Sequence, residues 1–173
     1  PEAYIQRLVE HTLIRPLRDE WTVARAEMEL LLRTAQEKDR PRTGRTGKGK
    51  QTSQQRALER GHAFRKYLAG LRVLDPACGS GNFLYVALKE MKCLEGEVVR
   101  ALSAAGDRQI WLDIPGETVH PDKFLGIELK PWAAKIAELV LWIGYLQWQV
   151  SSDRVRRMPD PVLKDVQHIS NRD

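Results

Sequence analysis

The sequence has little of what builds disulfide frameworks, metal centres or membrane spans. It holds two cysteines, Cys78 and Cys93, which form neither a CxxC pair nor a zinc-ligand spacing. This usage favours a reducing compartment and argues against a disulfide scaffold. No basic and then apolar leader opens the chain, so we expect no secretory signal. The most apolar stretch, 133–150, carries charges at Lys135 and Glu138, which argues against a membrane span.

Several catalytic signatures are also missing. No GK[ST] follows a glycine turn, so the chain has no Walker loop. No nucleophile stands in a recognisable arrangement with a base, which argues against a hydrolase. The histidines follow no metal-ligand spacing, and we expect surface or packing roles for them: His11, His62, His120 and His168.

Positive charge is concentrated in one segment. The net charge is +5, but residues 38–66 hold ten basic and two acidic residues, so this segment carries +8 and the rest of the chain −3. The segment can contact DNA phosphates as an arm, with four residues as the candidates: Arg42, Arg45, Lys48 and Lys50. A solvated insertion explains the same charges equally well. Aromatic residues for base stacking are absent from the candidate arm.

Hydrophobic periodicity predicts alternating helices and strands. Pro16 is expected to end the first helix, and Asp19 is a candidate N-cap for the second. The last long helix is apolar around most of its circumference and should be buried against a sheet. Its tryptophans are expected in the core or at an interface. The predicted helices are 2–15, 19–37, 56–68, 83–105 and 131–150, and the predicted strands are 71–74, 124–128 and 166–169.

Strands that alternate with helices long enough to cross over predict an α/β fold with a parallel sheet. We expect a partial Rossmann-like fold of about three strands, preceded by N-terminal helices. Residues 1–70 would be a helical region that includes a basic, flexible loop at 39–55, because that stretch lacks apolar residues to bury. Residues 71–173 would form the Rossmann-like portion.

A tight glycine turn follows the first strand. The sequence "VLDPACGSGNFL" (73–84) places Asp75 at a strand end and Gly79 and Gly81 before a helical pattern. Ligands of open parallel sheets bind beyond the carboxyl ends of the strands. Glycines let the main chain come close to such a ligand, and the helix start adds free N–H groups. Leu84 replaces the third glycine of GxGxxG, so the match to a dinucleotide fingerprint is incomplete.

The next strand supplies a second acid. "FLGIEL" (124–129) ends in Glu128 and Leu129, and an acid at position 128 can accept hydrogen bonds from both hydroxyls of a ribose. Taken alone, Asp75 is equally well explained as a helix cap and Glu128 as an exposed charge. Together, the two strand-end acids and the glycine turn favour a ligand site.

At these residues the sequence resembles S-adenosylmethionine-dependent DNA methyltransferases, above all the adenine-N6 type of restriction-modification systems. "VLDPACGSGNFL" resembles the cofactor loop of that family, "FLGIELKPWAAKIAELVLWIG" its second motif, and "PEAYIQRLVEHTLIRPL" the helix after its N-terminal motif. The resemblance implies S-adenosylmethionine as cofactor, double-stranded DNA as partner of the full-length protein, and a bacterial-type cytoplasmic location. The implied cofactor residues are Asp75, Pro76, Ala77, Cys78, Gly79, Gly81, Asn82, Phe83, Glu128, Leu129 and Asp173.

By position, the resemblance assigns each part of the cofactor to one group of residues. Asp75 would approach the methionine amino end, and the backbone of 77–81 would line the cofactor. Glu128 would hold the ribose and Leu129 would pack on the adenine. Asp173 stands where the family often places an acid near the adenine amino group.

One family motif is missing from this sequence. The Asn/Asp-Pro-Pro-aromatic tetrapeptide that positions the flipped target base does not occur, and no Pro-Pro pair is present. We therefore expect this chain to hold the methyl donor without transferring the methyl group. An unpaired edge of the first strand would let it self-associate. A non-catalytic nucleic-acid-binding module, or a methyltransferase acting on RNA or protein, remains open as an alternative.

Overall fold

The computed structural model describes residues 2–37, 48–107, 116–151 and 169–171; for residues 2, 37, 48–52 and 151 it describes the backbone only. The chain forms two compact units. Unit 1 consists of Pro1–Ile14, Gly70–Cys93 and Val119–Asp173, and unit 2 of Arg15–Ala69 and Leu94–Thr118. One long helix, α4 (Asn82–Ala104), contributes its first part to unit 1 and its second part to unit 2. The expected domain boundary after residue 70 stays a prediction.

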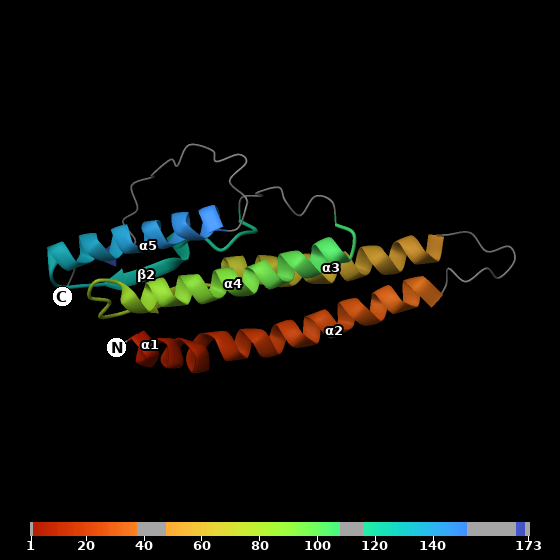
Figure 1. Cartoon of the computed structure of the whole chain (residues 1–173), viewed down its shortest axis with the longest axis horizontal. Coiled ribbons are helices and arrows are strands. Elements are labelled where there is room, and N and C mark those ends of the chain that lie inside the picture. Colours follow the sequence, from red (N-terminus) through yellow and green to blue (C-terminus); the bar gives the residue numbers. More distant parts are fainter. Residues whose placement is uncertain (1, 38–47, 108–115, 152–168, 172–173) are drawn as a thin grey trace, which may run out of the picture. The chain divides into compact units, whose positions relative to one another are not determined.

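Unit 1 contains a parallel sheet (Figure 1). Its strands are β1 (Val73–Asp75), β2 (Phe124–Ile127) and β3 (Ile169–Ser170), in the order β1-β2-β3. Asp75 is in register with Gly126, and Gly126 with Ile169. Of the third predicted strand, only Ile169 lies within the described residues. The expected partial Rossmann-like α/β fold with N-terminal helices is confirmed.

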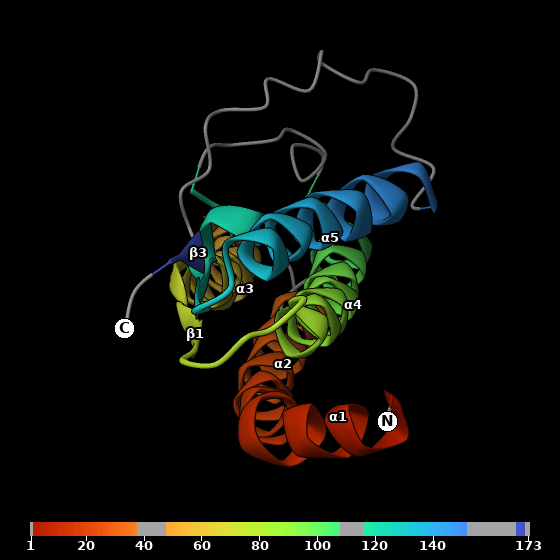
Figure 2. The ribbon, with the colours of Figure 1, turned by 90° about the vertical axis from the view of Figure 1, so that its left-hand side faces the viewer.

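Two helices pack closely in unit 1, α4 and α5 (Pro131–Ser151), which lie side by side in Figure 2. Glycines allow the close approach. A Cβ on Gly144 would lie 2.5 Å from the ring of Tyr85, and one on Gly81 would lie 2.9 Å from the Cβ of Ala137. The buried residues of α5 include the small side chains of Ala133, Ala134 and Ala137, followed by Leu141.

The helix expected to be buried against a sheet, α5, is buried on one face only. Its outward side chains are large, apolar and exposed, among them Trp132, Leu139 and Val150. A mean hydropathy profile does not separate two apolar faces of one helix, and only the inner face packs on α4. No helix among the described residues is long and apolar enough to cross a membrane.

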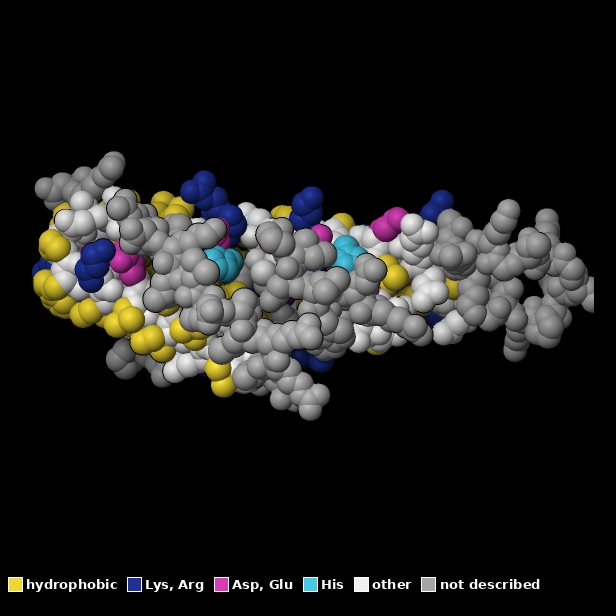
Figure 3. All heavy atoms as spheres, turned by 90° about the horizontal axis from the view of Figure 1, so that it is seen from above, with side chains coloured by type: hydrophobic (Ala, Val, Ile, Leu, Met, Phe, Trp, Pro, Cys, Tyr) yellow, Lys and Arg dark blue, Asp and Glu magenta, His cyan; other side chains and the backbone are white. Residues whose placement is uncertain are grey.

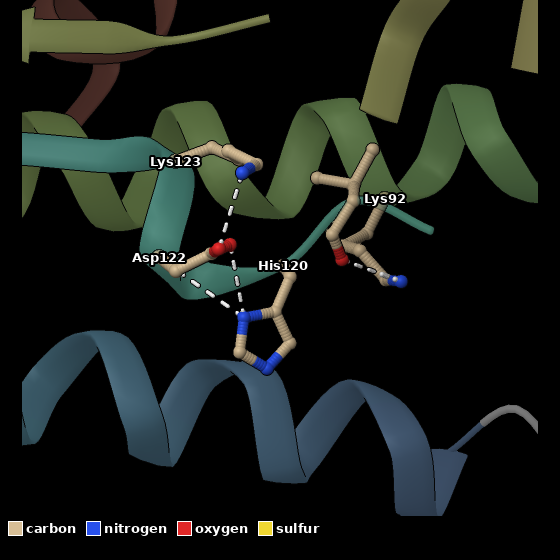
Figure 4. Close-up of polar contacts among 5 residues, drawn as sticks. Lys92, His120, Asp122 and Lys123 are labelled. Atoms are coloured by element: carbon tan, nitrogen blue, oxygen red, sulfur yellow. Dashed lines mark hydrogen bonds and ion pairs between the residues drawn. The ribbon is translucent and has the colours of Figure 1, made fainter. Parts of the chain in front are cut away.

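A polar cluster fixes the approach to β2 (Figure 4). His120 caps the short 3-10 helix η2 (Pro121–Lys123), and its Nδ1 accepts a hydrogen bond from the Asp122 backbone N–H. The His120 ring packs edge-on against Trp142, with the ring centroids 5.5 Å apart. The buried Lys92 of α4 donates to the carbonyl of Val119 at 3.1 Å. These contacts hold the segment before β2 against both helices, and they confirm the packing role expected for His120.

The N-terminal helices continue through Pro16, contrary to expectation. A π-helix, η1 (Glu10–Ile14), joins α1 (Glu2–Val9) directly to α2 (Arg15–Glu37). Pro16 is the second residue of α2, where the wider π turn before it relieves the clash between the proline ring and the preceding carbonyls. Asp19 therefore lies inside a helix and is not an N-cap.

Unit 2 is helical, built from α2, α3 (Lys48–Gly70) and the second part of α4. Trp21 and Phe64 pack with ring centroids 5.1 Å apart, and Leu102 lies against Gly61. Arg18 binds Glu97 at 2.9 Å.

The predicted loop at 39–55 is too long. Residues 48–55 are the start of α3, since Gln and Arg are good helix formers. Gln54 donates to the Ala105 carbonyl at 3.0 Å, and Ala57, one turn further along, is fully buried. Tertiary contacts thus stabilise a helix that hydrophobic periodicity does not reveal. The remainder of the predicted loop, 39–47, lies outside the described residues.

Candidate functional site

The loop after β1 turns back across the end of β2. The Asp75 carboxylate (Oδ1) accepts a hydrogen bond from the Ala77 N–H at 3.0 Å, which starts the turn. The Cys78 N–H then donates to the Ile127 carbonyl at 3.0 Å, and the Gly81 N–H to the Cys78 carbonyl at 2.8 Å. Cys78 is buried, and its Sγ would lie 2.6 Å from a Cβ at Gly126. The absence of a side chain at Gly126 therefore lets the loop cross β2.

The two loop glycines have different roles. Both have a left-handed backbone, with φ of 54° at Gly79 and 80° at Gly81. A Cβ on Gly79 would meet no atom within 4 Å, whereas one on Gly81 would lie 3.0 Å from the main chain of Ala137. Gly79 thus borders open space in which a ligand can approach the main chain. Gly81 allows the loop to pack on α5.

Glu128 joins the two halves of the site. Its Oε2 accepts a hydrogen bond from the Gly79 N–H at 2.9 Å, and its Oε1 accepts one from the Lys130 N–H at 2.9 Å. Each carboxylate oxygen can accept a second hydrogen bond, and the side chain is half-buried. The strand-end acid and the glycine loop, 49 residues apart in sequence, therefore form one continuous site.

Asn171 is a site residue that sequence analysis does not predict. It follows β3, and its Nδ2 donates to the carbonyls of Glu128 and Leu129, both at 2.8 Å. The Glu128 N–H donates to the Ser170 carbonyl at 3.0 Å. The end of β3 thus fixes the main chain that carries the acid. The signal is an amide side chain directly after a predicted strand, which sequence alone does not distinguish from a turn residue.

The surroundings of Cys78 disfavour a nucleophilic role for its thiol. Burial raises the pKa of its thiol first, and the negative charges of Asp75 and Glu128 raise this pKa further. A raised pKa keeps the sulfur protonated, and the thiolate is the reactive form. Cys78 is a small, buried side chain in a crowded loop.

The remaining predicted site residues surround this loop or lie elsewhere. Pro76 and Ala77 are exposed, and Asn82 and Phe83 form the first turn of α4. Leu129, 63% exposed, follows Glu128 directly. Asp173, Arg42 and Arg45 lie outside the described residues, and for Lys48 and Lys50 only the helical backbone is described.

The arrangement fits a ligand with several distinct chemical groups. The Glu128 carboxylate can accept from hydroxyls, and the exposed Leu129 beside it offers an apolar surface to a planar ring. Asp75 has one carboxylate oxygen engaged in the turn, so Oδ2 remains to pair with a cation. No group of His, Cys, Asp or Glu in the described part of the chain could hold a metal. Fold and site together define a partial Rossmann-like α/β domain with a candidate ligand site beyond the carboxyl ends of its strands.

Comparison with known proteins gives the family. Residues 49–171 match the family model described as "MmeI, DNA-methyltransferase domain". The chain belongs to this family, which confirms its resemblance to DNA methyltransferases of restriction-modification systems.

Two curated relatives match about half of the chain, and one solved structure matches nearly all of it. The chain is 36% identical over 74 residues to DNA methyltransferase A of Bacillus subtilis, and 33% identical over 85 residues to a putative type II restriction enzyme and methyltransferase of Methanocaldococcus jannaschii. These matches cover 43% and 49% of the chain, but only 8% and 7% of the relatives. The type IIL restriction-modification enzyme MmeI, solved in complex with DNA, matches with a TM-score of 0.68 and 29% identity over 99% of this chain and 19% of that one.

Proposed function

We propose that this chain is the S-adenosylmethionine-binding part of a site-specific DNA methyltransferase, of the adenine-N6 type, from a restriction-modification system. The observation that carries the proposal is the hydrogen bond between Glu128 and the Gly79 N–H. This bond holds the glycine loop next to the strand-end acid. The two cofactor motifs of the family must lie together in this way if both are to contact one ligand. The family membership supports the methyltransferase class.

Each residue of the proposed site would contact a different part of the cofactor. Glu128 would accept hydrogen bonds from the ribose hydroxyls with the lone pairs that Gly79 and Lys130 leave open. Leu129, exposed beside it, would pack on the adenine ring. Asp75 would attract the methionine ammonium, and the bare main chain at Gly79 would let the cofactor lie close to the loop. When bound, the cofactor supplies an activated methyl group.

The target base is a separate part of the proposal. The solved relative is a complex with DNA, and we propose double-stranded DNA as the partner of the full-length protein. Enzymes that modify a base take it out of the stack. The tetrapeptide that positions such a base in the family does not occur in this sequence. The proposed role of this chain is therefore to bind and orient the methyl donor.

Calorimetry with the purified chain tests the cofactor. We expect S-adenosylmethionine and its demethylated product to bind, and NAD to bind much more weakly. Glu128→Gln should weaken binding about 10- to 100-fold, since it removes charge-assisted bonds of about 1.5–3 kcal/mol. Glu10→Gln, at an exposed position of η1, is the matched control and should leave binding unchanged.

The change at residue 128 also affects the fold, so a second variant separates the two effects. Leu129→Ser removes the exposed apolar surface without touching the hydrogen bonds of the carboxylate. It should weaken binding while leaving thermal unfolding unchanged. A chain that prefers NAD, or that binds S-adenosylmethionine equally well in both variants, would refute the proposed site.

A further inference from the structure

The outer face of α5 carries an apolar stripe that nothing in the proposed function uses. The stripe residues are spaced by four and three in turn along the helix: Trp132, Ile136, Leu139, Ile143, Leu146 and Val150. Such spacing places all six on one side of a helix, as in a coiled-coil seam. We call this set the α5 seam.

Five of the six seam side chains are exposed. The exposed fractions are 63% at Trp132, 41% at Ile136, 58% at Leu139, 43% at Ile143 and 55% at Val150. Figure 3 shows hydrophobic side chains gathered in a row over the end of unit 1 where α5 lies. The buried residues of α5 are Ala133, Ala134, Ala137 and Leu141, so the helix has an apolar inner face as well as the exposed apolar seam.

We propose that the α5 seam is a self-association surface, on which α5 of a second copy of this chain packs in antiparallel orientation. The first argument is area. The seam exposes on the order of 500 Å² of apolar side chain, as large as the largest patches of typical monomers and more than half of the ~800 Å² per partner in a standard interface. Neighbouring residues on both sides of the seam would supply the rest.

The second argument is complementarity. The six residues are distributed evenly about the middle of the helix, so a twofold axis there places Trp132 opposite Val150 and Leu139 opposite Ile143 of the second copy. An isologous interface requires such self-complementary spacing. The 21-residue helix provides nearly three heptads of contact.

The distribution of charged residues on α5 favours a second copy of the chain over DNA, and an antiparallel over a parallel orientation. The seam itself contains no charged residue, so it does not suit DNA phosphates. The charged side chains of α5 are Lys135 and Glu138, which pair with each other at 3.1 Å. An antiparallel arrangement places Lys135 near Gln147 of the second copy, whereas a parallel one places the two Lys135 side chains together. Antiparallel packing also opposes the two helix dipoles.

Analytical ultracentrifugation of the 173-residue chain, from about 1 to about 100 μM, tests the association. We expect a dimer in the upper part of this range. Leu139→Asp and Ile143→Asp should each give a monomer, because both place a carboxylate in the seam. Leu30→Asp is the matched control: Leu30 is 67% exposed but lies on α2, away from the seam residues in sequence. It should leave the dimer intact.

Circular dichroism of each variant verifies that the helices are retained. A monomer at every concentration would overturn the proposal, and so would a dimer that persists in Leu139→Asp. The second result would support association through the β1 edge instead. For orientation, spin labels at Val150→Cys in a Cys93→Ser background should lie about 27 Å apart or more, the length of about 18 helical residues. Labels in direct proximity would overturn the antiparallel arrangement.

Discussion

The two glycines of the loop after β1 allow a matched pair of substitutions, Gly79→Ala and Gly81→Ala. Both positions have a left-handed backbone, so both variants carry the same kind of strain. They differ in what the new methyl group meets. At Gly79 it enters open space, and at Gly81 it lies 2.9 Å from the Cβ and 3.0 Å from the Cα of Ala137. The comparison therefore isolates the packing of the loop on α5.

The expected losses of stability can be worked out from these distances. A left-handed backbone costs a residue with a Cβ about 1–2 kcal/mol, and a less flexible unfolded chain returns about 0.4–1 kcal/mol. Gly79→Ala should therefore destabilise the fold by about 1 kcal/mol. Gly81→Ala adds an overpacking cost of about 1–3 kcal/mol, for a total of about 2–4 kcal/mol. This is a large part of the ~5–15 kcal/mol that stabilises a typical domain.

Urea unfolding followed by circular dichroism measures the difference. With a slope of about 2 kcal/mol per molar urea, the midpoint of Gly81→Ala should lie about 0.5–1.5 M below that of Gly79→Ala. Ala137→Gly in the Gly81→Ala background should recover part of the loss, because it removes the clash with the Ala137 side chain and leaves the one with the main chain. Equal midpoints for the two single variants would refute the assignment of separate roles. Gly79→Ala should instead weaken cofactor binding, since its methyl group occupies the open side of the loop.

Two further predictions concern the other contacts of the loop, and a third compares the two cysteines. Asn171→Asp places a carboxylate against the carbonyls of Glu128 and Leu129. It should lower the free energy of unfolding in urea by about 1–2 kcal/mol and weaken cofactor binding more than Asn171→Ala does. Identical behaviour of the two variants would contradict the positioning role of Asn171. Because the pKa of Cys78 is raised in the fold, the unfolded chain loses the thiol proton at lower pH, so stability should fall as pH rises above the ordinary thiol range. Cys78→Ala should remove this alkaline loss; an unchanged pH profile would argue against it. Iodoacetamide should alkylate the exposed Cys93 well before the buried Cys78, as peptide mass spectrometry would show.

Much of unit 1 could be predicted because its signals are local. Apolar periodicity located α4 and α5 within a residue or two, and a strand-end acid before a turn located β1 and β2. The meeting of Glu128 with the glycine loop followed from a general property of parallel sheets, since the carboxyl ends of neighbouring strands share an edge.

The errors arose where tertiary contacts or unusual backbone outweigh local signals. Pro16 normally ends a helix, and only the π turn at η1 explains its tolerance. The start of α3 looked like a loop because its stabilising contact, Gln54 to Ala105, joins residues 51 positions apart. Asn171 was missed for the same reason, since its partners lie 43 and 42 residues away. The two faces of α5 cannot be told apart until it is known which face packs on α4.

The Glu128 carboxylate accepts hydrogen bonds from both Gly79 and Lys130, and this affects how a variant that does not bind the ligand should be designed. The carboxylate ties the loop to the strand end, so the most obvious knockout position also stabilises the structure. A phenotype of Glu128→Ala in cells would therefore mix misfolding with lost binding, and would say little about either. Leu129, whose side chain is exposed, is the better position at which to silence the site while keeping the scaffold intact.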